Sequence, residues 1–371
     1  MELTSRERLL RSFRKETVDR VAVAPFIHQN FVKAFFKDPL ADLIQGTIDV
    51  YRHFGFDLMH RNLNVRYDEA DLQSAAWRVW STEQKTADTR IVTTKITTPE
   101  RELTQVIRYQ DLSPYFRVKA IVERFIKDEA DFEQFPKYQP PIPRLSFPDL
   151  QQAKQIIGEG GITAPWVSGV FNQVSDYRKL DDLLVDALIN PGFFKRMMRY
   201  FLERSIAHLE QVTAAGPDVL SYAGNIASGS MVGPRFFREH IFQYEKLLID
   251  RIQSRGVIVL YHNCGDARNM IEVYNDLGIS AYESITEPPY ADNDLQDALS
   301  RFDRSVTLIG NLDQIDFLRQ ASPEEIRAEV RKRLGIAAGR RGFILGTSDF
   351  LDENTAAENL FAMAEAAKIC N

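Results

Sequence analysis

Cysteine is almost absent from this chain of 371 residues, which contains only Cys264 and Cys370. Two cysteines cannot provide the disulfide framework of a small secreted domain, and their scarcity is typical of a reducing compartment. No apolar run approaches the roughly 20 residues of a membrane-spanning helix, and the first residues lead into a charged helical pattern instead of a secretory signal. We therefore expect a cytoplasmic protein without a membrane segment.

The chain also lacks a surplus of basic residues. It carries 46 lysines and arginines against 52 aspartates and glutamates, so its formal net charge is −6. A general nucleic-acid-binding protein needs a cationic surface for the phosphates, and we expect no nucleic-acid partner here. A small anionic ligand bound by a few arginines remains compatible with this composition.

Several common ligand-binding and catalytic motifs are missing as well. The sequence has no Walker-type loop, no glycine-rich dinucleotide loop after an early strand, and no Gly-x-Ser-x-Gly nucleophile elbow. The glycines of residues 158–161 precede a predicted strand, so they are interpreted as a turn. These absences argue against a doubly wound, nucleotide-binding open sheet.

What the sequence does contain is a regular alternation of strands and helices. Eight short apolar runs are predicted as strands, at residues 20–26, 56–59, 161–167, 218–223, 256–262, 280–285, 305–310 and 341–345. Each is followed by a helix or a helical turn, a pattern that implies parallel pairing with right-handed crossovers. Eight such units predict a (β/α)8 TIM barrel, and the open sheet is the alternative.

Two segments lie outside this alternation. A helix is predicted over residues 6–15, and its basic side chains, Arg8 among them, are expected to face solvent. After the second strand, residues 64–150 form an insertion, in which the runs 90–98 and 102–109 predict a β-hairpin and the proline-rich run 132–148 predicts irregular chain. We predict one barrel domain, residues 1–371.

The fifth predicted strand ends in a pair of metal-binding side chains. Its alternation places His262 and Cys264 on one face, at the carboxyl end where TIM barrels carry their active sites. An imidazole and a thiolate together suit zinc, which in catalytic sites usually has three protein ligands. Asp349, after the last strand on the face of Phe343 and Leu345, is our candidate for the third ligand, and Glu283 is a further carboxylate within reach.

This set is compatible with two kinds of catalysis. Zinc can hold an incoming thiol as a thiolate or activate water, and the sequence does not choose between them. Other polar residues in the loops after the strands are candidates for substrate contacts: His28, His60, Tyr222, Asn225, Asn311 and Asp313.

Motifs along nearly the whole chain resemble those of one superfamily. They are Glu7-Arg8-Leu9-Leu10 running to Val18-Asp19-Arg20-Val21, the helix start Gly233-Pro234-Arg235-Phe236-Phe237-Arg238-Glu239, the motif His262-Asn263-Cys264-Gly265, the loop Ile309-Gly310-Asn311-Leu312-Asp313, and Gly346 with Glu358-Asn359. The chain resembles the uroporphyrinogen decarboxylase superfamily, and within it the cobalamin-dependent, methylcobalamin:coenzyme M type methyltransferases. The resemblance implies zinc, a corrinoid as substrate or on a partner protein, a small methyl donor or acceptor, and a homodimer.

The sequence departs from the family patterns at two places. The zinc methyltransferases usually have a cysteine where this chain has Asp349. The decarboxylases carry an arginine-rich segment after the first strand and an aspartate after an early strand, whereas residues 26–30 and 60–64 read Phe-Ile-His-Gln-Asn and His-Arg-Asn-Leu-Asn. We therefore favour a zinc-dependent methyltransferase over a porphyrinogen-type decarboxylase. A non-catalytic barrel that binds a corrinoid or tetrapyrrole is the third hypothesis.

Overall fold

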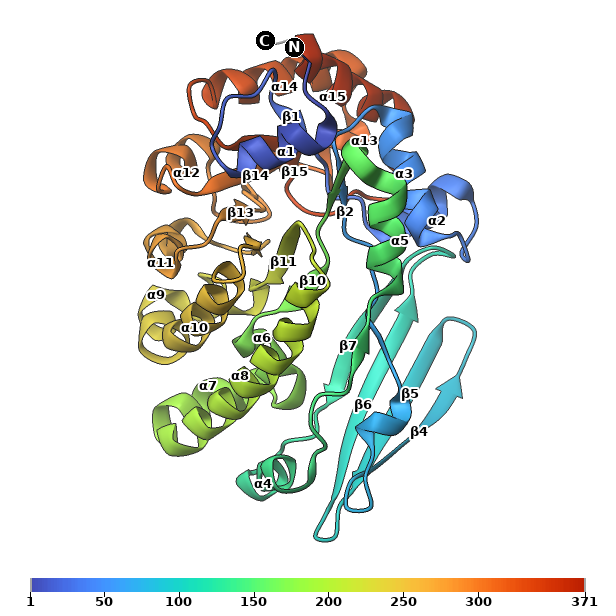
Figure 1. Ribbon diagram of the computed structural model, residues 1–371, viewed down its shortest axis with the longest axis vertical. Helices are drawn as coiled ribbons and strands as arrows, with labels where there is room; N and C mark the ends of the chain where they lie inside the picture. The colour runs from blue at the N-terminus through green and yellow to red at the C-terminus, as the bar shows by residue number, and fades with distance from the viewer. Residues whose placement is uncertain (1, 370–371) are drawn as a thin grey trace.

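The computed structural model describes residues 2–369, and its central element is a TIM barrel of parallel strands (Figure 1). In chain order the strands are β1 (Ala22–Val23), β2 (Leu58–His60), β9 (Gly161–Thr163) continued by β10 (Trp166–Ser168), β11 (Val219–Ala223), β12 (Ile258–His262), β13 (Ala281–Glu283), β14 (Thr307–Leu312) and β15 (Phe343–Thr347). One sheet runs β1-β15-β14-β13-β12-β11-β10, and β2 pairs in parallel with β9. The Asp57 N–H donates to the Val23 carbonyl at 2.7 Å and bridges β2 to β1. The predicted barrel is confirmed.

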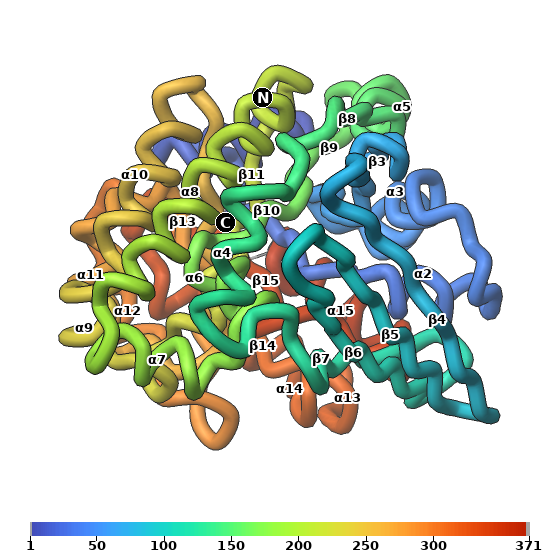
Figure 2. Tube along the Cα trace, turned by 90° about the horizontal axis from the view of Figure 1, so that it is seen from below, coloured from blue at the N-terminus to red at the C-terminus, as the bar shows by residue number. Residues whose placement is uncertain are grey.

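Helices surround the strands on the outside of the barrel, as Figure 2 shows from below. They are α2 (Gln29–Phe36), α3 (Leu43–Phe54), α5 (Pro148–Ile157), α6 (Val170–Tyr177), α7 (Leu180–Ile189), α8 (Pro191–Ala214), α9 (Gly233–Phe236), α10 (Phe242–Gln253), α11 (Ile271–Leu277), α12 (Leu295–Arg301), α13 (Phe317–Gln320), α14 (Pro323–Ile336) and α15 (Ala357–Ile369). Among residues 2–369, none of the helices combines the length and the apolar character needed to cross a bilayer.

Alternation along the strands divides the apolar side chains into two layers. The inner cluster fills the barrel and takes side chains from the strands, for example Met59, Leu260 and Ile309. The outer cluster joins the opposite strand faces to the helices, for example through Leu58 and Leu308. Because side chains along a strand alternate between faces, this parity decides which residues at the strand ends face the barrel axis.

Helix α1 (Ser5–Phe13) closes the amino-terminal end of the barrel, because Leu9 and Phe13 belong to the inner cluster. Arg8 on this helix is only 3% exposed, which contradicts the prediction that it faces solvent. Its guanidinium donates to Asp57 at 2.6 Å and to Asp19 at 2.8 Å, and Arg20 donates to the same Asp57 carboxylate at 2.7 Å. The sequence pattern predicts a basic helix face, but it does not show that Asp19 and Asp57 lie against this face and pair with the buried Arg8.

The insertion contains a four-stranded antiparallel sheet that extends away from the helix α1 end of the barrel (Figure 1). Its strands are β4 (Arg78–Lys85), β5 (Thr89–Thr97), β6 (Glu102–Asp111) and β7 (Arg117–Glu123), while β3 (Arg66–Tyr67) pairs with β8 (Leu145–Ser146). The predicted hairpin is β5–β6, and β4 and β7 are additional strands. The sequence does not predict them, because most of their side chains are exposed and the apolar alternation of β7 is limited to Val118, Ala120 and Val122. Helix α4 (Glu129–Tyr138) contradicts the prediction of irregular chain from residue 132. The single-domain boundary stays a prediction.

We predict that Asp57→Ala destabilises the protein by about 3–5 kcal/mol, because it leaves the buried Arg8 and its neighbour Arg20 without their shared carboxylate. The free energy of unfolding, measured with a chemical denaturant, checks this. Glu239→Gln breaks an exposed pair with Arg235 and should leave the unfolding midpoint where it is. Equal midpoints for all three proteins would contradict the prediction.

Candidate metal centre

Three side chains of different chemistry meet at the carboxyl end of the barrel. One ligand atom from each of His262, Cys264 and Asp349 lies within 4.8 Å of the others, and His262 Nε2 is 3.8 Å from Asp349 Oδ1. Tetrahedral zinc with bonds of about 2.0–2.3 Å would hold such atoms roughly 3.5 Å apart, so small side-chain movements suffice. The nitrogen, sulfur and oxygen donors therefore fit a zinc ion. Cys370, the other cysteine, lies outside the described residues.

Asp349 reaches this group by a different route from the one that the sequence suggested. Phe343 and Leu345 belong to the outer cluster, so the strand face that they share points away from the barrel axis. Strand β15 ends at Thr347 and the chain then bends, which brings the Asp349 carboxylate round to His262. The Asp349 N–H donates to the side chain of Gln314 at 3.1 Å and fixes the bend. The predicted meeting of these residues holds, but the predicted strand face is wrong.

Glu283 lies on the other side of the His262 ring and is not part of the group of three. One Glu283 oxygen is 2.9 Å from His262 Nδ1 and accepts from Arg61 Nη1 at 2.6 Å, while Arg61 Nη2 donates to the other oxygen. A carboxylate on one ring nitrogen leaves the other nitrogen free for a metal and sets the ring orientation. Glu283 is therefore placed to orient the His262 ring, and it does not lie among the three candidate ligands as the sequence allowed.

The charges in this arrangement move two pKa values in opposite directions. Burial favours neutral Glu283, but the Arg61 guanidinium and the bond to His262 outweigh it and lower the pKa of Glu283 to about 2. Burial also disfavours protonated His262, yet bonds to Cys264 and Glu283 and the charge of Asp349 raise the pKa of His262 to about 10. In the metal-free protein the ring is thus held as a cation among anions.

The loop that carries both His262 and Cys264 is fixed by two buried tyrosines. The side-chain amide of Asn263 donates to the Tyr274 hydroxyl at 2.6 Å, and the Tyr282 hydroxyl donates to the Asn263 carbonyl at 2.9 Å. The two rings stack with their centroids 5.5 Å apart. Sequence reasoning did not select these tyrosines or Arg61, although their positions at strand ends and in the next helix are visible in the sequence.

Aromatic rings form a wall beside the candidate ligands His262, Cys264 and Asp349, which we call the metal group. The Phe26 ring centroid lies 5.9 Å from that of His262 and 5.5 Å from that of Trp166. Phe350, next to Asp349, packs against His28 at 5.2 Å. Phe116 in the β6–β7 loop of the insertion packs on Phe350 at 5.8 Å. The inserted sheet thus contributes to the same wall, and His28 is half-buried within it as a candidate substrate contact.

Two predicted substrate contacts are contradicted by their positions in the outer layer. His60 is fully buried, its Nε2 lies 3.1 Å from the Ile44 carbonyl of α3, and burial lowers its pKa to about 4. Tyr222 is also fully buried, and its hydroxyl donates to Glu245 of α10. Both residues occupy strand positions whose side chains point outward, so each side chain lies against a helix and away from the barrel mouth.

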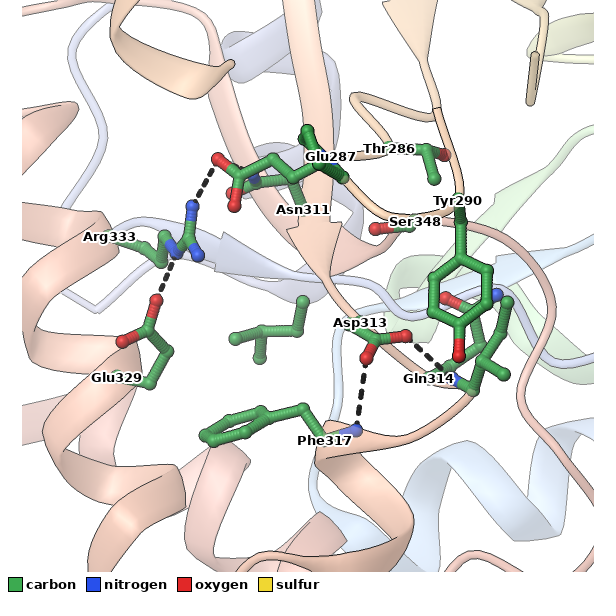
Figure 3. Close-up of a pocket in the computed structure, with 13 residues that line it drawn as sticks. Thr286, Glu287, Tyr290, Asn311, Asp313, Gln314, Phe317, Glu329, Arg333 and Ser348 are labelled. Carbon is green, nitrogen blue, oxygen red and sulfur yellow. Dashed lines mark hydrogen bonds and ion pairs between the residues drawn. The ribbon is translucent and has the colours of Figure 1, made fainter. Parts of the chain in front are cut away.

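The other predicted contacts lie at the carboxyl end of the barrel but apart from the three ligand candidates. Asn225 is exposed and accepts from Asn172 at 2.8 Å. Asn311 and Asp313 line a cavity of about 300 Å³ beside β14 (Figure 3). Asp313 also accepts from the Phe317 N–H at 3.0 Å, so it caps the start of α13. Their contact with a substrate stays a prediction.

Comparison with protein-family models gives a match over residues 83–369, to the family described as uroporphyrinogen decarboxylase (URO-D). The match covers well over half of the chain and includes the whole metal group. The chain belongs to the uroporphyrinogen decarboxylase family, as its motifs suggested.

The relatives it resembles are methyltransferases. The methylcobamide:CoM methyltransferase MtbA of Methanosarcina mazei is 24% identical over 172 residues, which are 46% of this chain and 48% of the relative. MtbA of Methanosarcina acetivorans is 23% identical over 44% of this chain and 45% of the relative. The chain thus matches about half the length of these curated relatives. A solved methyltransferase structure from Methanosarcina mazei has the same fold, with a TM-score of 0.71 over 99% of each chain at 15% identity.

We predict that zinc affinity rises with pH, because a metal must displace the proton that His262 carries below its pKa of about 10. One displaced proton corresponds to about tenfold in apparent affinity per pH unit, and competition with a chromophoric chelator from neutral to alkaline pH measures the slope. The same proton stabilises the metal-free fold. Because the folded pKa is raised above 6.5, that stability is complete below 6.5 and disappears as the pH rises through about 10. Since the metal also displaces the proton of the Cys264 thiol, a slope that is smaller by one proton would indicate a neutral ring.

Tyr282→Phe is expected to weaken zinc binding by about tenfold, since it removes the hydroxyl that holds the Asn263 carbonyl while keeping the stacked ring. Chelator competition again provides the measurement. The control is Tyr244→Phe, because the buried Tyr244 makes no hydroxyl hydrogen bond within the described part of the chain. If both variants bind zinc as the parent does, the tyrosines do not position the ligand loop.

Proposed function

We propose that this protein is a zinc-dependent methyltransferase that moves a methyl group between a corrinoid and a small thiol or methylated substrate. The observation that carries the proposal is the group of His262, Cys264 and Asp349 at the carboxyl end of the barrel. The likeness to methyltransferases named for methylcobamide and CoM supports the reaction class. The corrinoid would be a free substrate or would be carried by a partner protein.

The three side chains would hold zinc through His262 Nε2, the Cys264 sulfur and an Asp349 oxygen, and leave a position for a substrate atom. Zinc bound there supplies a Lewis acid that lowers the pKa of a thiol substrate and keeps it as a thiolate. Glu283 keeps the His262 ring oriented, and Arg61 keeps Glu283 ionised in a buried site. The rings of Phe26 and Trp166 pack edge to face with His262 and cover part of its surface.

Decarboxylation of a porphyrinogen is the second candidate, because it is the reaction for which the family is named. A ring with several carboxylates requires unpaired cations at the mouth of the barrel. Arg61 packs against the same aromatic wall, 4.5 Å from the Phe26 ring centroid, but both of its terminal nitrogens bind Glu283. The Asp349 carboxylate of the metal group would also repel the carboxylates of such a substrate. These charges favour methyl transfer.

A non-catalytic barrel that binds a corrinoid or tetrapyrrole is the third candidate. It would need no ordered set of metal ligands, whereas His262 is oriented by Glu283 and the Asn263 loop by two tyrosines. A fixed imidazole with one free nitrogen suits catalysis better than passive binding. Tight corrinoid binding without turnover would favour this candidate.

We predict one zinc ion per chain and thiol-dependent demethylation of methylcobalamin, and loss of both in Cys264→Ala. The rate should fall by at least about 100-fold, because the variant lacks the sulfur donor of the set. Metal analysis and the absorbance change of methylcobalamin with a panel of thiols provide the two measurements. Uroporphyrinogen turnover, followed by carbon dioxide release, tests the second candidate in the same preparation.

Three variants make the experiment specific. Asp349→Cys restores the cysteine of the zinc methyltransferases and should retain the metal, whereas Asp349→Ala should lose most of it. Cys370→Ala removes the other cysteine and serves as the matched control for Cys264→Ala. Absence of stoichiometric zinc from the parent protein, together with full activity of Cys264→Ala, would refute the proposal.

A further inference from the structure

The cavity of about 300 Å³ lies between the segment after β13, the end of β14 and helix α14 (Figure 3). None of His262, Cys264 and Asp349 lines it. It adjoins the metal group through Gln314, whose side chain lines the cavity and accepts from the Asp349 N–H. The cavity is therefore a compartment beside the metal centre, and its lining can be considered on its own.

Two buried side chains in the lining each have one polar atom without a hydrogen-bond partner among residues 2–369. Asn311 is 2% exposed and its Oδ1 accepts no hydrogen bond from the described residues, while Thr286 is 7% exposed and its hydroxyl makes none with them. Folded proteins rarely leave such atoms unsatisfied, because desolvation without a hydrogen bond costs free energy. Both residues line the cavity while the two atoms themselves are covered, so a small rotation of each side chain would let a molecule inside the cavity supply the missing bonds.

The charged part of the lining is acidic. Arg333 is held between two carboxylates, donating to Glu287 at 2.6 Å and to Glu329 at 2.5 Å. The Asn311 side-chain amide and the Leu295 N–H donate to the same Glu287 oxygen at 3.0 and 3.3 Å, and no group in the described part of the chain donates to the second Glu287 oxygen. Asp313 adds a third carboxylate against the single guanidinium. The lining thus offers acceptors and a net negative charge.

We propose that this cavity is a binding site for a small cationic molecule that carries ammonium and hydroxyl donors. The ammonium would pair with the free oxygen of Glu287, and the donors would satisfy Asn311 Oδ1 and the Thr286 hydroxyl. The site is separate from the proposed zinc chemistry, so it can be present or absent whatever the outcome of the metal experiments.

Three probes of nearly equal size test the charge preference on the full chain. They are 2-amino-1,3-propanediol as its ammonium ion, neutral glycerol and anionic glycerate, each titrated by calorimetry into metal-free and zinc-loaded protein. We expect the ammonium ion to bind at least about tenfold more tightly than glycerol, and glycerate to bind most weakly, because a charge-assisted hydrogen bond exceeds a neutral one. Equal affinities, a preference for glycerate, or occupancy by water alone with no heat from the ammonium ion would overturn the proposal.

Substitutions then locate the site. Glu287→Gln should weaken binding of the ammonium ion by about tenfold, and Thr286→Val, which keeps the volume, by about threefold. Glu324→Gln on α14 is the matched control, because the Glu324 side chain is exposed and lies outside the cavity lining. If Glu287→Gln does not fold, Thr286→Val still decides. Binding that neither variant changes would place the ammonium ion elsewhere and refute the assignment.

Discussion

The buried carboxylate of Glu283 connects the two sides of the site, and the orientation of the metal group depends on it. It accepts hydrogen bonds from both terminal nitrogens of Arg61, which follows β2. It also contacts the Nδ1 of His262 at the end of β12. A buried ion pair contributes little net stability, since desolvation offsets its attraction. Its value here is geometric: with Nδ1 engaged, Nε2 is the nitrogen that remains for Asp349 and Cys264, and the ring cannot turn without breaking the bond.

One rule, the alternation of side chains along each strand, accounts for most of the site that sequence could predict. It places His262 and Glu283 on the inner face and correctly groups His262 with Cys264. The same rule, applied to the neighbours of Met59, would have selected Arg61 in place of His60. A selection of polar residues in the loops that ignores this alternation also includes Tyr222, whose side chain points outward. The barrel itself followed from the eight apolar runs.

Other features depend on contacts that no local pattern encodes. Asp349 meets His262 only because the chain bends after Thr347, and that bend is fixed by Gln314 from another loop. The aromatic wall likewise combines Phe26, Phe350 and Phe116, from the first strand loop, the last strand loop and the insertion. Apolar rings separated by hundreds of residues carry no sequence signal of their meeting, because each is equally compatible with an ordinary core.

Asp349 stands where the zinc methyltransferases that this chain resembles usually have a cysteine, and it would preserve the charge of the proposed donor set while changing its chemistry. A thiolate and a carboxylate each contribute one negative charge, and neutral His262 contributes none, so the three side chains, bound as proposed, would together offset the charge of a divalent cation. The Arg61–Glu283 pair adds no net charge beside them. An oxygen donor is harder than sulfur and gives less electron density to the metal, which favours a more Lewis-acidic ion and stronger binding of an anionic substrate atom. In the proposed zinc site the balance of charge would therefore permit Asp349, and the hardness of its oxygen would give a substrate preference different from that of a site with two cysteines.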